Sequence, residues 1–334
     1  MSMVSESSVH AAIARATRFV VRHQDDDGAW RDFYVLPGRS DAWVTAYAGA
    51  QLLRIAQWRS SHTCDRAIAS AIDFVERARK AGGGWGYNSN CPADADSTAR
   101  SLLFLHAAGA KVRLRDYADL ARFAVRDGAF ATYRAGDAWG GWCRGHADVT
   151  AVALRALGHV LAPSHALVRR GRARLSAYLR RRDAFASYWW TTPFYLALEV
   201  ALLFEGSAHA PAVELPRFPL PPDAGSFERA LACEVALVRR DIVAATRYAR
   251  QLIESQRDDG SWLPARILRV VDPRSKSARD IYCNRSEIVA DDRAIFTSST
   301  VTGALVRFEA MRARLYTRER VGGGHLHIVQ PSLA

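Results

Sequence analysis

Two aspartates stand two positions apart at the start of an apolar segment, in the stretch CPADADSTARSLLFL that runs from Cys91 to Leu105. A single Asp is enough to cap the first turn of a helix, so the second carboxylate needs another explanation. Burial and a neighbouring negative charge both raise the pKa of a carboxyl group above its usual value of about 4, so such a pair can share a proton near neutral pH. The stretch therefore predicts a helix that begins with a candidate general acid, and a pair of plain helix caps is the alternative.

Four further segments have the same plan, in which a polar start leads into small and apolar residues. The five segments begin at Asp41, Asp94, His146, Thr192 and Phe296, and the first four starts are about 53, 52 and 46 residues apart. A period near 50 residues indicates a repeat architecture. Because apolar residues cover nearly the whole circumference of each segment, we expect buried helices.

More polar, amphipathic segments alternate with the buried ones. They cover residues 11–23, 67–79, 117–126, 168–182 and 230–255, the last of these in two parts. Strand signals are sparse. The alternation predicts an all-α fold in which an inner ring of helices is surrounded by an outer ring, an (α/α)6 toroid. In such a ring the inner helices are parallel, so their starts share one end.

We expect one toroid domain over residues 1–334, with two irregular segments. Residues 209–224 are too rich in proline for a helix and are predicted to form an external connection. The tail from residue 322 is expected to be flexible.

Composition excludes several classes of protein. The most apolar stretch, residues 194–204, is far shorter than the roughly 20 residues of a spanning helix, and the N-terminus lacks the pattern of a signal peptide, so a cytoplasmic protein is expected. Five scattered cysteines without a C-x-x-C pair argue against a disulfide framework or a cysteine-rich zinc site. The net charge of +12 is mostly arginine, which we assign to solvated outer helix faces rather than to nucleic-acid binding.

The loops carry a second repeated signal. QDDDGAW (24–30) and QRDDGSW (256–262) share the pattern Q-x3-G-x-W, and 81–87 and 137–142 are weaker copies. Physically, Gln can cap an outer helix, Gly permits the turn that ends it, and Trp packs over the turn. On repeats of about 50 residues, these motifs resemble the QW motifs of squalene-hopene and oxidosqualene cyclases and of class II diterpene cyclases. The β subunits of protein prenyltransferases share the same toroid.

The segment DADSTA (94–99) resembles the acid motif D-x-D-D-T-A of class II terpene cyclases, with Ser97 in place of the last Asp. The resemblance implies that Asp96 donates a proton and that Asp94 is the preceding carboxylate. After the proton transfer, hydrogen bonds from Ser97, Thr98 or a nearby imidazole would stabilise the new carboxylate, and we assign His146, at the head of the next buried helix, as an orienting partner. Corresponding aspartates at positions 41 and 148 favour an architectural role for Asp94, and His146 has a cap as its alternative role.

Aromatic residues cluster near the starts of the buried helices, where their faces would stabilise a carbocation. The candidate substrate-binding residues are Trp43, Tyr47, Trp85, Trp139, Trp142, Trp189, Trp190, Phe194, Tyr195 and Phe296. Structural packing is the alternative for each of them, and for Trp30 and Trp262 it is the preferred interpretation.

The resemblance implies a class II terpene cyclase-like enzyme in which an aspartic acid protonates an isoprenoid, or a related hydrophobic substrate, and starts its cyclisation or isomerisation. No cofactor or metal is expected, with Mg²⁺ added if the substrate carries a diphosphate. The expected partner is a small hydrophobic substrate, and peripheral membrane contact and a homodimer are compatible with this interpretation.

Three alternatives stay open. A prenyltransferase β-like subunit would need a zinc site, for which Asp280 and Cys283 exist but no His follows before His325. A toroid of this size could instead perform acid–base chemistry on a non-terpenoid metabolite. It could also bind a hydrophobic ligand or a protein without catalysis.

Overall fold

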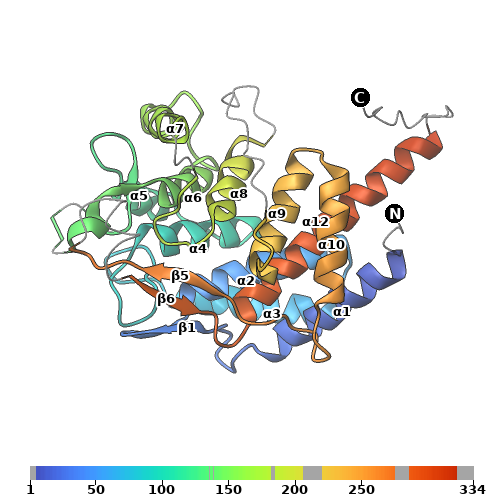
Figure 1. Cartoon of the computed structure of the whole chain (residues 1–334). Helices are drawn as coiled ribbons and strands as arrows, with labels where there is room; N and C mark the ends of the chain where they lie inside the picture. The colour runs from blue at the N-terminus through green and yellow to red at the C-terminus, as the bar shows by residue number, and fades with distance from the viewer. Residues whose placement is uncertain are drawn as a thin grey trace, which may run out of the picture.

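The computed structural model describes residues 5–134, 136–137, 139–181, 185–205, 220–274 and 286–321. Within these ranges, six helices form a closed inner ring in which each packs on the next and the last returns to the first (Figure 1). In ring order they are α2 (Ala42–Trp58), α4 (Ala95–Ala107), α6 (Ala147–Leu157), α8 (Pro193–Phe204), α9 (Ser226–Val238) and α12 (Ile295–Val321). The closed ring confirms the predicted α/α toroid.

An outer layer of amphipathic helices covers the inner ring. The outer helices of the described ranges are α1 (Glu6–Arg22), α3 (His62–Arg77), α5 (Leu114–Ala121), α7 (Ala166–Leu179) and α10 (Ile242–Glu254). Helix α1 buries one stripe that includes Val9, Ile13 and Val20, whereas α8 buries every residue of 194–201. A helix that is apolar all round needs neighbours on every side, so the inner position of α8 follows from its sequence.

The sequence pattern placed one inner helix, α9 (Ser226–Val238), in the outer layer. Residues 230–255 were expected to be outer, but α9 belongs to the inner ring, between α8 and α12, and α10 alone is outer. Residues 230–237 of α9 are all buried. Glu234 made the segment look amphipathic, yet it lies inside the fold, where Arg54 and Arg307 pair with its carboxylate at 3.4 and 3.3 Å.

Three short antiparallel hairpins precede inner helices, and the sparse strand signals did not predict them. They are β1 (Asp32–Val35) with β2 (Gly38–Ser40), β3 (Phe130–Ala131) with β4 (Gly145–His146), and β5 (Arg266–Val270) with β6 (Glu287–Ala290). These hairpins lead into α2, α6 and α12 respectively, so they all stand at the end of the toroid where inner helices begin (Figure 1).

The two Q-x3-G-x-W loops connect neighbouring outer helices. The Gln24 amide donates to Gly28 O in its own loop and to Ala67 O of α3, and the Trp30 indole donates to Val20 O. Gly28 has φ +91°, a conformation that costs glycine little. Each loop is therefore tied both to the helix before it and to the next repeat.

The second Q-x3-G-x-W loop, residues 256–262, joins the last repeat to the first and so closes the ring. The Gln256 amide donates to Gly260 O and to Ala12 O of α1, each at 3.0 Å, and Trp262 donates to Leu252 O at 2.7 Å. In Figure 1 the blue N-terminal helix α1 accordingly lies beside the red C-terminal helix α12, and the two are in contact.

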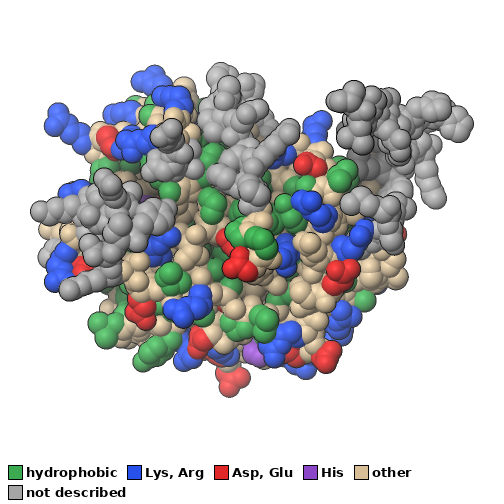
Figure 2. All heavy atoms as spheres, in the orientation of Figure 1, with side chains coloured by type: hydrophobic (Ala, Val, Ile, Leu, Met, Phe, Trp, Pro, Cys, Tyr) green, Lys and Arg blue, Asp and Glu red, His purple; other side chains and the backbone are tan. Residues whose placement is uncertain are grey.

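The described residues cover only part of the segments that the sequence predicted to be irregular. Residues 209–219 of the predicted connection and the tail from 322 lie outside them. No helix in the described ranges is long and apolar enough to cross a bilayer. On the face in Figure 2, Lys and Arg side chains are scattered among acidic and apolar ones and form no continuous stripe.

Candidate active site

A cavity of about 650 Å³ opens at the end of the toroid where the inner helices begin. The starts of α2 and α4 contribute residues to it, together with the loop before α8, the turn between β1 and β2, and the hairpin β5–β6. The lining residues of the described ranges are Val35, Leu36, Pro37, Trp43, Tyr87, Asn90, Cys91, Pro92, Asp94, Asp96, Ser97, Thr132, Tyr133, Trp139, Trp142, Trp189, Trp190, Leu268, Val270, Val271, Asp272, Pro273 and Glu287. Its volume is in the range of small-molecule sites.

Asp94 is the N-cap of α4. Its Oδ1 accepts the backbone N–H of Ser97 at 2.7 Å, and its Oδ2 accepts the Ser97 hydroxyl at 2.7 Å. Burial raises the pKa of Asp94 and the bonds from Ser97 lower it, with a balance at about 7. The cap alternative thus describes the bonding of Asp94, although its carboxyl also borders the cavity.

Asp96 is different because its side chain faces the cavity without a direct hydrogen bond from the described residues. Burial raises the pKa of Asp96 to about 6; Arg100 one turn later lowers it, while Asp148 and Glu199 raise it. The indole N–H of Trp43 is buried without a regular hydrogen-bond partner in these ranges, and its approach to the Asp96 carboxyl opposes the rise. A half-buried carboxyl group that faces a cavity and has a raised pKa can act as a general acid.

Ser97 and His146 do not hold Asp96 as expected. The Ser97 hydroxyl is used by Asp94. The Nε2 atom of His146 pairs with Gly141 O at 3.1 Å, its ring stacks on Tyr188 at 3.5 Å, and burial lowers its pKa to about 3. His146 is therefore a neutral imidazole at the start of α6, and its structural alternative fits the geometry.

Asp148, two residues after His146, positions part of the cavity wall. Its Oδ2 accepts the backbone N–H groups of Tyr188 and Trp189, each at 2.9 Å. The Trp189 indole then donates to the Thr132 hydroxyl at 2.8 Å. The loop that carries two of the predicted tryptophans is thus fixed by a carboxylate on the neighbouring inner helix.

Half of the predicted aromatic set lines the cavity. Trp43, Trp139, Trp142, Trp189 and Trp190 are in its wall. Of these, Trp139 and Trp142 lie nearly parallel, 5.6 Å apart, and Trp139 is 40% exposed. The Trp142 indole donates to Val271 O at 2.8 Å, which joins the aromatic loop to the chain that follows β5.

The other half of the set does not reach the cavity, so those predictions of lining are corrected. Trp85 is fully buried and donates to Val75 O at 2.6 Å, because it repeats the packing of Trp30. Phe194 lines a groove on the outside of the ring. Tyr47, Tyr195 and Phe296 are buried deeper in the ring.

Stacked rings fill the inner ring behind Trp43 and Trp190 of the cavity wall. Trp190 lies 4.0 Å from Tyr195 and 5.4 Å from Phe296, and Phe296 lies 4.1 Å from Tyr47 and 5.2 Å from Trp43. These side chains fill the inner ring where a longer cavity would otherwise extend.

A buried ion network lies next to these stacked rings. Arg100 donates to the Tyr195 hydroxyl and, at 2.7 Å, to Glu199, which also accepts from Arg155. Burial alone would raise the pKa of Glu199, but the two guanidinium groups lower it to about 2. The network therefore stays charged near Asp96 at neutral pH.

Sequence reasoning missed the lining residues that come from hairpins and loops. Val35, Leu36 and Pro37 come from the β1–β2 turn, and Leu268 and Val270 come from β5. Tyr133, just ahead of the weak Trp-loop copy at 137–142, lines the cavity too. So does Tyr87, the last residue of the copy at 81–87, which the sequence had placed in the aromatic cluster at the helix starts. A search of the chain ahead of each inner helix, rather than within it, would have found them.

No metal centre is found at the cavity among the described residues. The group of possible ligands that comes together in these ranges is Glu6, His10 and Glu309, at the contact of α1 with α12. Arg312 pairs with Glu309 there at 2.9 Å, so the group is an ion network between the two helices. Asp280 and Cys283, considered for zinc, lie outside the described residues.

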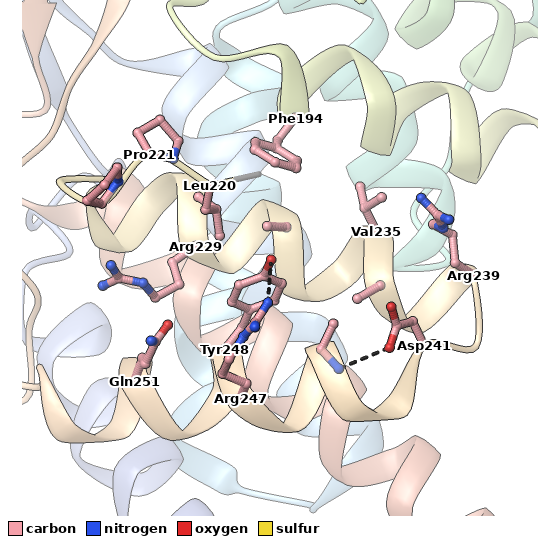
Figure 3. A pocket seen from close by; sticks show the side chains of 14 residues that line it. Phe194, Leu220, Pro221, Arg229, Val235, Arg239, Asp241, Arg247, Tyr248 and Gln251 are labelled. Atoms are coloured by element: carbon pink, nitrogen blue, oxygen red, sulfur yellow. Dashed lines mark hydrogen bonds between the residues drawn. The ribbon is translucent and has the colours of Figure 1, made fainter. Parts of the chain in front are cut away.

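A second hollow, of about 570 Å³, lies on the outer side of α9 and α10 (Figure 3). Arg229, Arg239 and Arg247 surround it. Its carboxylate in the described ranges, Asp241, accepts the Ala244 N–H at 3.0 Å and so caps α10. The acid of this groove is an exposed helix cap beside three arginines, so the cavity with Asp96 is the better candidate.

Solved structures with the same fold include terpene cyclases. The chain superposes on the apo type II terpene cyclase MstE from Scytonema with a TM-score of 0.80 and 25% identity, over 92% of this chain and 100% of that one. Variants of MstE were solved with geranylgeranyl dihydroxybenzoate as substrate and with merosterolic acid A as product. A protein from Actinoplanes matches with a TM-score of 0.74 and 26% identity, over 90% and 99% of the two chains.

A more distant match is the ent-copalyl diphosphate synthase from Streptomyces platensis, with a TM-score of 0.55 and 18% identity over 81% of this chain and 50% of that enzyme. No protein-family model and no curated protein matches the sequence. The fold is therefore that of class II terpene cyclases, and the similarity supports a cyclase-like enzyme.

Proposed function

We propose that this protein is a class II terpene cyclase-like enzyme in which Asp96 protonates an alkene of an isoprenoid chain. The observation that carries the proposal is the contrast within one helix turn. Asp94 is bonded as a cap, whereas the Asp96 carboxyl faces an aromatic cavity with a pKa raised to about 6.

The reaction is an isomerisation. The O–H bond of neutral Asp96 breaks as the alkene π electrons form a new C–H bond, which leaves a tertiary carbocation. The next alkene of the chain attacks that cation and closes a ring, and the last cation loses a proton to solvent. The Asp96 carboxylate takes up a proton again, so no oxidant or reductant is needed.

The protonation state of Asp96 is suited to this role. With a pKa of about 6, roughly one molecule in ten carries the proton at pH 7. A hydrophobic substrate that displaces water from the cavity raises the pKa further, because the charged form loses solvation.

The cavity wall stabilises the cation. Trp43, Trp189 and Trp190 line the same cavity as Asp96, and a ring face contributes about 0.5–2 kcal/mol to a nearby positive charge. The apolar wall also keeps water from trapping the intermediate. An isoprenoid chain fits this lining, and the isoprenoid substrate of MstE supports the same class of ligand for this chain.

The test is incubation of the purified protein with geranylgeranylated aromatic compounds and linear isoprenoids, with products identified by mass spectrometry and NMR. Asp96→Asn is expected to lower turnover about 100- to 10,000-fold, because the general acid is lost. Asp94→Asn, two positions away on the same helix, should lose tenfold or less, because Asn also caps helices. Equal turnover by wild type and Asp96→Asn would contradict the proposal.

A further inference from the structure

Three neighbouring inner helices present corresponding residues around the proposed acid. The second residue after the N-cap is Trp43 on α2, Asp96 on α4 and Asp148 on α6. Helix α4 packs on α2 at one side and on α6 at the other. Because the inner helices are parallel, Asp96 has the Trp43 indole as its neighbour on one side and the Asp148 carboxyl group on the other.

The Asp148 carboxylate is used by the loop before α8. Its Oδ2 accepts the N–H groups of Tyr188 and Trp189 at 2.9 Å each, and its Oδ1 accepts the N–H of Val149 at 3.1 Å. A carboxylate bonded in this way offers Asp96 a like charge rather than a hydrogen bond. A donor for Asp96 has to come from α4 itself or from α2.

The side-chain donors on α4 are engaged with other residues. The Ser97 hydroxyl donates to Asp94 at 2.7 Å. The Arg100 guanidinium is bonded to α8, and although its Nε atom has no hydrogen-bond partner in the described ranges, it acts on Asp96 through its charge. The remaining side-chain donor next to Asp96 is the Trp43 indole on α2.

The Trp43 indole differs from the other indoles of the protein in its hydrogen bonding. Five others donate to an oxygen atom at 2.6–2.8 Å, and they belong to Trp30, Trp85, Trp142, Trp189 and Trp262. Trp43 is 4% exposed, yet its Nε1 has no regular hydrogen bond to a described residue. A buried N–H without an acceptor costs free energy, so an acceptor is expected for it. The group that it approaches is the Asp96 carboxyl.

Aromatic packing fixes the direction of this N–H. The Trp43 ring lies 5.2 Å from the ring of Phe296, at an angle of 24°, and 5.6 Å from that of Phe33. Trp190, a second residue of the cavity wall, lies 5.8 Å away. A ring enclosed by such neighbours keeps one orientation. A donor that is fixed in advance can stabilise a charge as it develops in the reaction.

We infer that Trp43 positions the general acid: its indole N–H bonds one oxygen of the Asp96 carboxyl group and so directs the other oxygen, with its proton, into the cavity. When the proton has passed to the alkene, the same N–H stabilises the carboxylate that remains. The inference rests on the proposed function, since it gives a role to a neighbour of the proposed acid. This role differs from that of a cation-stabilising ring face, which Trp43 shares with the other tryptophans of the wall.

Several ionisable groups surround Asp96. They are Asp94 and Arg100 on α4, Asp148 on α6, and Tyr195 and Glu199 on α8. Burial raises the pKa of Glu199 and its two arginines lower it, with a balance at about 2, so Glu199 stays charged at neutral pH. Burial raises the pKa of Asp148, and that of Asp94 to about 7. A signal that reports on Asp96 therefore has to disappear when Asp96 alone is replaced.

The direct test follows the indole N–H signals of the nine tryptophans by NMR, in protein labelled with nitrogen-15 tryptophan. As pH rises through about 6, one signal is expected to shift downfield, because the bond to the Asp96 carboxylate strengthens. The same signal should stay constant in Asp96→Asn. Absence of an indole signal that titrates in the wild type and not in Asp96→Asn overturns the inference, and this comparison needs no change at Trp43.

Trp43→Phe then assigns the signal and tests its effect on the reaction. The variant keeps an aromatic ring and loses the N–H, so the titrating signal should be missing; its persistence overturns the inference. The fall of kcat/KM should move to higher pH by about one pH unit, because a bond that favours the charged acid is lost. At lower pH, kcat should drop about 10- to 100-fold, because the acid is less well oriented.

Trp190→Phe is the matched control, since it makes the same change in the same cavity wall. Whatever its effect on the rate, it should leave the pH at which kcat/KM falls where it is in the wild type. An unmoved pH profile in Trp43→Phe, or an equal shift in Trp190→Phe, contradicts the inference.

The NMR and kinetic results separate this inference from the proposed function. An indole signal that titrates with Asp96, in a protein that cyclises no isoprenoid, supports the contact and contradicts the proposed reaction. Cyclisation that depends on Asp96, without such a signal and with an unchanged pH profile in Trp43→Phe, does the reverse.

Discussion

Asp94 and Asp96 begin the same helix and have opposite surroundings. Asp94 receives two hydrogen bonds from Ser97, while Asp96 faces the cavity next to Trp43 and one turn before Arg100. The sequence singled out Asp96 on the expectation that Asp41 and Asp148 repeat the position of Asp94. That expectation is right for Asp41, the N-cap of α2, but His146 is the N-cap of α6, so Asp148 matches Asp96 instead. The sequence could not show that Ser97 serves Asp94, since that depends on the rotamer at the first turn of α4.

The pH dependence of turnover should follow Asp96. The acid acts in its protonated form, and its pKa is raised to about 6, so kcat/KM is expected to be high below pH 6 and to fall as pH rises through that value. Rates are measured over this range, with circular dichroism to confirm that the fold is intact. A rate that instead rises through pH 6 would indicate a base and contradict the acid role.

Arg100 is expected to shift the pH at which kcat/KM falls. Removing its guanidinium in Arg100→Met takes away the main group that lowers the pKa of Asp96, so the fall in rate is expected to move to higher pH. Loss of one partner from the buried network with Glu199 should also lower the free energy of unfolding by about 3–5 kcal/mol. The double variant Arg100→Met/Glu199→Met removes both charges and should recover part of that stability. If the pH at which the rate falls is the same in Arg100→Met as in the wild type, Arg100 does not lower the pKa of Asp96.

At the scale of elements, helices with uniform burial could be predicted and mixed ones could not. The segments that became α2, α4, α6, α8 and α12 read as buried because nearly every position is small or apolar. Helix α9 was misassigned because one charged side chain, Glu234, is satisfied inside the fold by Arg54 and Arg307. The hairpins were missed because their strands are only two to five residues long and because some of their contacts are far along the chain, as between β1 and β6.

Asp32 shows how such a partner acts on an element. Its carboxylate, at the start of β1, accepts the N–H groups of Arg293, Ile295 and Phe296 and thereby caps α12. Asp32→Ala leaves these buried donors unpaired, and the free energy of unfolding is expected to fall by about 2–4 kcal/mol in urea denaturation. Asp73→Ala, on the exposed side of α3, should change it by less than about 0.5 kcal/mol. Similar values for both variants would contradict the capping role.

At the scale of the whole molecule, the period near 50 residues predicted a ring, and the ring closes through the Q-x3-G-x-W loops. Closure itself was predictable because buried helices at both ends of the chain need a neighbour. The depth of the cavity was not, since Trp190 and Phe296 fill the ring by stacking that no spacing reveals. Localisation, membrane contact and oligomeric state stay predictions.

A substitution of Gln256 tests whether the last repeat stabilises the ring through its contact with α1. Its amide joins the last repeat to Ala12 of α1, so Gln256→Ala is expected to lower the free energy of unfolding by about 1–2 kcal/mol while unfolding remains a single transition. Gln57→Ala, an exposed residue of α2, is the matched control and should have little effect. Separate unfolding of the first repeat in the wild type would show that the ring is not one cooperative unit.

The central claim is the transfer of a proton from Asp96 to carbon, and turnover in D₂O measures it most directly. With a geranylgeranylated aromatic compound as substrate, the cyclised product is expected to carry one non-exchangeable deuterium at the carbon that was protonated, and Asp96→Asn should form almost none of this product. A cyclised product free of deuterium, or an undiminished yield from Asp96→Asn, would contradict the account.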